Sequence, residues 1–66
     1  MAILKVIEIL SNSDTSWEDA TKKAVKHASK TVKNIKSVYV QDQSAIVRND
    51  EVTEFRVNLK ITFEVN

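Results

Sequence analysis

Few side chains in this 66-residue sequence could carry out covalent chemistry. There is no cysteine, and His27 is the only histidine, so the sequence offers no thiolate nucleophile and no histidine cluster for a metal. None of the serines lies in a nucleophile-elbow motif. Glu54 and Glu64 are ten residues apart on one predicted strand, which is too far for two carboxylates that act on one bond. We therefore expect a protein that is not an enzyme.

Two side chains could instead bind a ligand. Tyr39 and Arg56 both fall on the polar side of their predicted strands. An aromatic ring and a guanidinium side by side on an open sheet face could hold a planar ligand or an anion. The alternative is an ordinary contact between subunits, or a pair that is simply solvated.

Carboxylates near the predicted hairpin could bind calcium, which prefers hard oxygen ligands. They are Asp42, Asp50, Glu51 and Glu54. Their spacing does not form a dedicated loop such as that of the EF-hand.

The charge balance argues against a nucleic-acid-binding protein. Ten basic and nine acidic residues give a net charge of +1, without the clustered excess of Lys and Arg that nucleic acids attract. Lysines at 22, 23, 26, 30, 33 and 36 follow one segment, which we interpret as a solvated helix face.

No membrane or targeting segment is recognisable. The apolar stretch Met1–Leu10 is interrupted by Lys5 and Glu8, and no small-residue cleavage site follows it. No run approaches the roughly 20 apolar residues of a membrane span. We expect a soluble, cytoplasmic protein.

The small size makes self-association an expectation. Residues 1–66 form one domain, and a chain of about 60 residues buries only about 60% of the surface that it exposes when unfolded. Disulfides and thiolate metal sites are excluded, so oligomerisation is the remaining common route to stability.

The clearest structural signal is the alternation from Thr53 to Val65. From Glu54 onward, apolar side chains occupy the odd positions and polar side chains the even ones. Because side chains on a strand point alternately to opposite faces, this segment is predicted to be one long strand with one apolar face.

The segment from Trp17 to about Lys36 is predicted to be the only helix. A capping box precedes it, either Thr15 with Glu18 or Ser16 with Asp19. Residues of one face recur at helical spacing: Trp17, Ala20, Thr21, Ala24, Ala28, Thr31, Val32 and Ile35. The position of Trp17 on this stripe favours a core role for its ring over ligand stacking.

Two further strands complete the predicted fold. They are Ile3–Leu10, followed by a polar turn at Ser11–Ser16, and Ser37–Val47, with a bulge near Gln43–Ala45. A two-residue hairpin loop within Arg48–Glu51 would join the second strand to the third. The prediction is an α+β fold of order β-α-β-β, with the third strand central in a three-stranded antiparallel sheet wrapped around the helix.

Several segments together resemble the dodecin family, in the same order and over essentially the whole chain. They are Lys5–Ile9 (KVIEI), Ser16–Ala20 (SWEDA), Lys30–Ile35 (KTVKNI), Val40–Gln43 (VQDQ) and Glu54–Val65 (EFRVNLKITFEV). The resemblance implies a hollow homododecamer that binds stacked pairs of flavins (FMN, riboflavin or FAD) for storage or sequestration.

The sequence departs from the flavin-binding pattern at two positions. Flavin-binding dodecins carry a stacking Trp where this chain has Ser37, and a Gln that hydrogen-bonds the ring where it has Arg56. Asp42 and Gln43 match the family pattern. The resemblance thus implies a ligand position lined by Ser37, Tyr39 and Arg56, with help from Asp42 and Gln43.

A branch of the family with a Ser-Trp-Glu helix start and Arg at the position of Arg56 looks more similar, and it is associated with calcium. The alternative is therefore a structural or calcium-binding shell without flavin. In that shell Arg56 would form intersubunit salt bridges with carboxylates such as Glu54.

Overall fold

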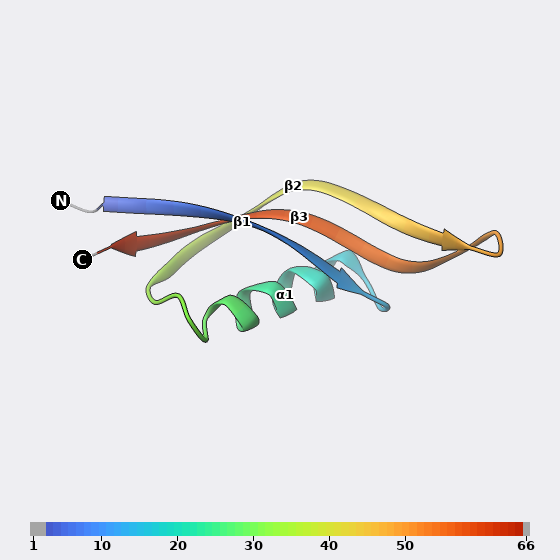
Figure 1. Cartoon of the computed structure of the whole chain (residues 1–66), viewed down its shortest axis with the longest axis horizontal. Coiled ribbons are helices and arrows are strands. Elements are labelled where there is room, and N and C mark those ends of the chain that lie inside the picture. Colours follow the sequence, from blue (N-terminus) through green and yellow to red (C-terminus); the bar gives the residue numbers. More distant parts are fainter. Residues whose placement is uncertain (1–2, 66) are drawn as a thin grey trace.

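The computed structural model describes residues 3–65, which form a three-stranded sheet and one helix. The elements are β1 (Ile3–Ser13), α1 (Trp17–Ala28), β2 (Ile35–Arg48) and β3 (Glu51–Val65). β3 lies between β1 and β2 and runs antiparallel to both (Figure 1). The predicted α+β architecture and the central position of the third strand are confirmed. Met1, which begins the apolar N-terminal segment, lies outside the described residues.

The core forms between α1 and the odd-numbered side chains of β3. Val57, Leu59 and Ile61 are at most 1% exposed, and Ala20 and Ala24 of α1 are buried against this row. The short alanine side chains let the helix axis approach the sheet closely. Trp17 packs on the same cluster, as predicted from its place on the apolar stripe.

The helix covers only part of one face of the sheet. It lies mainly against β1 and β3 and contacts β2 much less. Figure 1 shows α1 on one side of the sheet, while the β2–β3 hairpin projects beyond the start of the helix. The molecule is accordingly elongated, with extents of 51 × 20 × 13 Å.

The helix is shorter than the sequence predicted. It ends at Ala28 rather than near Lys36, so Thr31, Val32 and Ile35 continue the helical spacing outside the helix. Ile35 instead pairs with Phe63 as the first residue of β2. Strand pairing therefore overrides the local periodicity at Ile35, whereas Thr31 and Val32 lie in the connection between α1 and β2.

β1 is longer than predicted, because Ser11–Ser13 continue the strand rather than form a turn. Ser11 pairs with Val57 and Ser13 with Phe55, which extends the ladder by three residues. Of the two capping alternatives, the structure selects Ser16, whose Oγ accepts a hydrogen bond from the backbone N–H of Asp19 at 2.9 Å.

The predicted bulge lies earlier in β2 than expected. Gln43 to Ala45 pair in continuous register, whereas the register shifts between Val40 and Asp42, which leaves Gln41 as the extra residue. Side chains after Gln41 therefore point to the face opposite to the one that simple alternation would give them.

The two-residue hairpin loop is confirmed. Arg48 pairs with Glu51, and Asn49 and Asp50 between them have φ values of 52° and 63°. Two consecutive left-handed residues are the geometry of a type I′ turn, whose twist matches that of the flanking strands.

Candidate functional site

The candidate site is the outer face of the sheet, which we define as the face opposite to α1. The even-numbered side chains of β3 from Glu54 to Glu64 point to it, together with their partners on β1 and β2. α1 packs on the opposite face, so residues 3–65 provide no second layer here (Figure 1).

Large apolar side chains are exposed on the outer face. Leu4, Val6 and Leu10 of β1 are 55%, 55% and 66% exposed, and Tyr39 of β2 is 64% exposed. Each pairs with an even-numbered residue of β3, which places all of them on this face. Exposed apolar side chains gathered on one face are typical of an interaction surface.

Four of the five predicted site residues lie on the outer face. Ser37 pairs with Thr62, Tyr39 with Lys60 and Asp42 with Asn58, and Arg56 is itself an even-numbered residue of β3. Gln43 pairs with the buried Val57, so its register position belongs to the helix side of the sheet. The bulge at Gln41 causes this division.

The predicted pair of Tyr39 and Arg56 is not side by side in one chain. The partner of Tyr39 is Lys60, four residues from Arg56, and strand geometry makes that separation about 13 Å. Ser37 lies farther away still, about 20 Å along the strand from Arg56. The four residues thus form a row along the sheet and not a closed pocket within one subunit.

The structure gives Arg56 a partner that sequence reasoning missed. Its Nε donates a hydrogen bond to Oδ1 of Asn12, 2.9 Å away, and the two residues are direct partners across β3 and β1. The residue types alone gave no signal for this contact. It depends on the register of β1, including Ser11–Ser13, for which the sequence predicts a turn.

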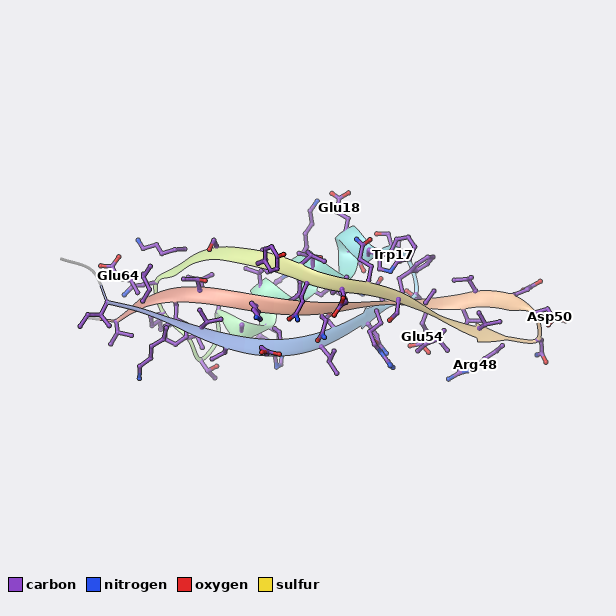
Figure 2. The ribbon with its side chains drawn as sticks, turned by 90° about the horizontal axis from the view of Figure 1, so that it is seen from above. Trp17, Glu18, Arg48, Asp50, Glu54 and Glu64 are labelled. Carbon is purple, nitrogen blue, oxygen red and sulfur yellow. The ribbon has the colours of Figure 1, made fainter. Side chains whose placement is uncertain are left out.

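A short polar chain continues from Asn12 across the sheet. Nδ2 of Asn12 donates to Oε1 of Glu54 at 3.4 Å, and Nη2 of Arg48 lies 3.6 Å from Oε2 of the same carboxylate. Figure 2 shows Arg48 and Glu54 close together on the hairpin, with Asp50 at its tip. The charge of Glu54 is therefore compensated by Arg48.

The carboxylates predicted as calcium ligands are spread over the hairpin. Asp50 lies in the turn, Glu51 opens β3, Glu54 pairs with Arg48, and Asp42 lies across from Asn58. Among residues 3–65, no three His, Asp or Glu side chains gather as a metal site would require.

An open hollow of about 340 Å³ lies near the middle of β1. Its lining includes the outer-face residues Glu8, Leu10 and Asn58. Asn58 pairs with Leu10 on one side and with Asp42 on the other. A planar molecule on this part of the outer face would thus meet Leu10 and the Glu8 carboxylate on β1 and the Asn58 amide on β3.

The shifted ionisable groups lie at the start of α1 and not on the outer face. The Ser13 hydroxyl, which donates to the Asp19 carboxylate at 2.6 Å, lowers the pKa of Asp19, and Lys23 adds to the effect. The neighbouring Glu18 carboxylate raises the pKa of Lys22. These groups stabilise the helix start and offer no proton-transfer pair.

Comparison with known proteins decides the family. A sequence model described as Dodecin matches residues 3–66. The chain belongs to the dodecin family. A calcium dodecin from Mycobacterium tuberculosis is 34% identical over 65 residues, which cover 98% of this chain and 92% of that protein.

Solved dodecin structures share the fold. A dodecin from Streptomyces coelicolor superposes with a TM-score of 0.94 at 23% identity, covering 98% of this chain and 93% of that one. The crystal structure of the M. tuberculosis calcium dodecin, described as having a novel calcium-binding site, gives a TM-score of 0.85 at 33% identity, with coverages of 97% and 91%. Within the part of this dodecin that the structure describes, no helix is both long and apolar enough to cross a membrane.

Proposed function

We propose that this dodecin is a homododecamer that binds and sequesters a small ligand, a flavin, without catalysing a reaction. The observation that carries the proposal is the row of exposed apolar side chains on the outer face: Leu4, Val6, Leu10 and Tyr39. A chain of this size gains stability by burying such a face against copies of itself.

The ligand position is completed by more than one copy. Ser37, Tyr39, Asp42 and Arg56 lie in a row about 20 Å long, so a compact pocket needs corresponding residues of a second subunit. Tyr39 would supply an aromatic surface and Arg56 a cationic group to FMN, riboflavin or FAD. Gln43, on the other face, would contribute only from a different copy at a subunit boundary.

The inventory of reactive groups supports binding rather than catalysis. The sequence has no cysteine and one histidine, and His27 is an exposed residue of α1, on the side of the sheet opposite to Tyr39 and Arg56. A flavin held between subunits would be shielded from solvent. The proposed site offers it no nucleophilic or acid–base side chain that could catalyse a reaction.

Two measurements on the purified protein test the proposal. Light scattering should give a mass of about 90 kDa, twelve times the 7.5 kDa of one chain. Riboflavin fluorescence should be quenched by the protein at micromolar concentration, because ring stacking quenches the excited flavin. A monomer would contradict the assembly, and unchanged fluorescence of all three flavins would contradict the ligand.

A calcium-binding shell without flavin is the second candidate, favoured by the 34% identical calcium dodecin. In this shell Arg56 forms salt bridges between subunits with carboxylates such as Glu54. A rise in melting temperature with added calcium, in a dodecamer that leaves riboflavin fluorescence unchanged, would support it. No change with calcium would contradict it.

No nucleic-acid or membrane partner is part of either candidate, since the charge of +1 is evenly spread. The cytoplasmic location stays a prediction.

A further inference from the structure

The two edges of the sheet differ in how regularly their strands are paired. β1 forms one edge and β2 the other, and Figure 2 shows β1, in pale blue, along its edge. β2 has three register shifts, whereas all eleven residues of β1 pair with β3 without a shift. Bulges are one of the ways in which proteins keep an edge strand from pairing further. β2 has this protection and β1 lacks it.

The free side of β1 has backbone donors and acceptors to offer. In an antiparallel pair, every second residue of an edge strand directs its N–H and C=O groups away from its partner. Within residues 3–65, β1 pairs only with β3, and no backbone–backbone hydrogen bond is formed on its other side. The edge of β1 is therefore able to pair with a fourth strand.

An open cleft of about 360 Å³ lies beside this edge, between β1 and α1. It is lined by residues 9–12 of β1 and by Lys23, Ala24 and His27 of α1. No Asp or Glu is among these lining residues, and the carboxylate that contacts the Lys23 ammonium at 3.1 Å, that of Asp19, lies outside the lining. The cleft thus presents an ammonium and an imidazole, which complement a carboxylate.

The two faces of β1 specify the side chains of a strand that pairs with it. On the helix side, the added side chains would meet the cleft, which favours acidic residues. On the outer face they would meet the exposed Leu4, Val6 and Leu10, which favour apolar residues, and Glu8, which repels acidic ones. Because side chains of a strand alternate between the faces, the matching segment alternates acidic and apolar residues.

A second copy of this chain does not supply that pattern. The helix-side positions of β1 and β2 are those that pair with the odd-numbered residues of β3 from Phe55 to Val65. Neither edge strand carries Asp or Glu at these positions, and the one charged residue that β1 has there is Lys5. The complementary segment therefore belongs to a different polypeptide.

From this arrangement we infer that the free edge of β1 binds an extended segment of another polypeptide, with acidic side chains toward α1 and apolar side chains toward the outer face. The segment adds to the sheet as a fourth strand through main-chain hydrogen bonds, and Lys23 and His27 bind its carboxylates. This inference does not rest on the proposed function, because an edge strand pairs through its backbone whether or not a flavin or calcium is bound.

The probe is a short peptide of alternating valine and glutamate, blocked at both ends and added to the full chain. Hydrogen exchange followed by mass spectrometry should show that the peptide slows the exchange of backbone amides in β1 about tenfold or more and leaves β2 unchanged. Fluorescence anisotropy of a labelled form gives its affinity. A peptide of alternating valine and lysine should bind at least about tenfold more weakly, because its charges face Lys23.

Charge reversal in the cleft tests the two α1 residues. Lys23→Glu and His27→Glu should each weaken binding of the glutamate peptide about tenfold, and Lys23→Glu should strengthen binding of the lysine peptide by a similar factor. Lys26→Glu is the matched control, because Lys26 is exposed on the same helix and does not line the cleft. It should change both affinities by less than about threefold. If Lys23→Glu, which also loses the Asp19 contact, fails to fold, His27→Glu decides the question.

Three results would overturn the inference. The first is protection of β2 instead of β1, or equal affinities for the two peptides. The second is a β1 whose amides are all protected before any peptide is added, since a second copy would then occupy the edge. The third is undiminished binding of a glutamate peptide methylated at its backbone nitrogens, because the cleft would then bind carboxylates without strand pairing.

Discussion

The indole nitrogen of Trp17 donates a hydrogen bond to the backbone carbonyl oxygen of Ser44, 2.8 Å away. This contact joins the first residue of α1 to β2, the strand that the helix otherwise touches least. The Trp17 ring also meets Phe55 of β3 edge-on, with centroids 5.0 Å apart and planes at 75°. Figure 2 labels Trp17 at this end of the helix, beside β2.

Replacing Trp17 should therefore loosen the helix start. Trp17→Phe keeps much of the packing and loses the hydrogen bond, so the free energy of unfolding should fall by about 1 kcal/mol. Trp17→Ala should cost about 3 kcal/mol, because the edge-on contact and the apolar burial are lost as well. Urea unfolding at one fixed protein concentration measures both, with the exposed Lys26→Ala as the control. Equal stability of Trp17→Phe and Trp17→Ala would contradict this role.

Stability should depend on pH through Asp19. Its pKa is lowered in the folded state from an ordinary value of 3.8, chiefly by the Ser13 hydroxyl and then by Lys23. The folded state therefore binds this proton less readily than the unfolded state. The stabilisation is complete above pH 3.8 and is lost as the pH falls through the lower folded pKa.

Ser13→Ala tests that assignment. Ser13 is 4% exposed and its Oγ also accepts the backbone N–H of Thr15 at 3.0 Å, so the variant should lose about 1 to 3 kcal/mol near neutral pH. The deficit should shrink in acid, where protonation of Asp19 weakens in the native protein the contact that the variant already lacks. Thermal melts across this pH range measure it, and a deficit independent of pH would show that Asp19 is not involved.

The hairpin turn should tolerate glycine well. Asp50 has a φ of 63°, a conformation that glycine adopts without the steric cost of a Cβ atom. We expect Asp50→Gly to raise the free energy of unfolding by about 0.5 kcal/mol. Asn58→Gly, in the middle of β3, should lower it by a similar amount. Chemical denaturation compares the two, and destabilisation by both would argue against the type I′ geometry.

Flavin binding should respond to an aromatic ring at position 37. Ser37→Trp places an indole on the outer face opposite Thr62, where the family resemblance implies a stacking partner. A stacking contact contributes on the order of 1 kcal/mol, so the riboflavin affinity should rise about fivefold or more. Fluorescence titration measures it. No gain in Ser37→Trp would mean that the pocket geometry differs from that of flavin-binding dodecins.

The alternation of β3 predicted both the strand and its buried row of Val57, Leu59 and Ile61, because a period of two is imposed by the backbone itself. The end of α1 was not predictable in the same way. Ile35 fits the helical stripe as well as it fits a strand, and only its pairing with Phe63 decides between them.

The candidate site was predicted in part for a similar reason. Parity placed Tyr39 and Arg56 on the outer face correctly. The distance between them, and the assignment of Asp42 and Gln43 to opposite faces, depend on the bulge at Gln41 and on the register with β3. Register is a property of paired strands, so the contact between Asn12 and Arg56 has no local signature in the sequence.

The most direct test of the account is the mass of the protein in dilute solution, measured by sedimentation equilibrium. We predict a single species of about 90 kDa that persists at micromolar concentration, because the exposed side chains of the outer face are buried between copies. A stable, folded species of 7.5 kDa would contradict the account, since the outer face would then need no partner.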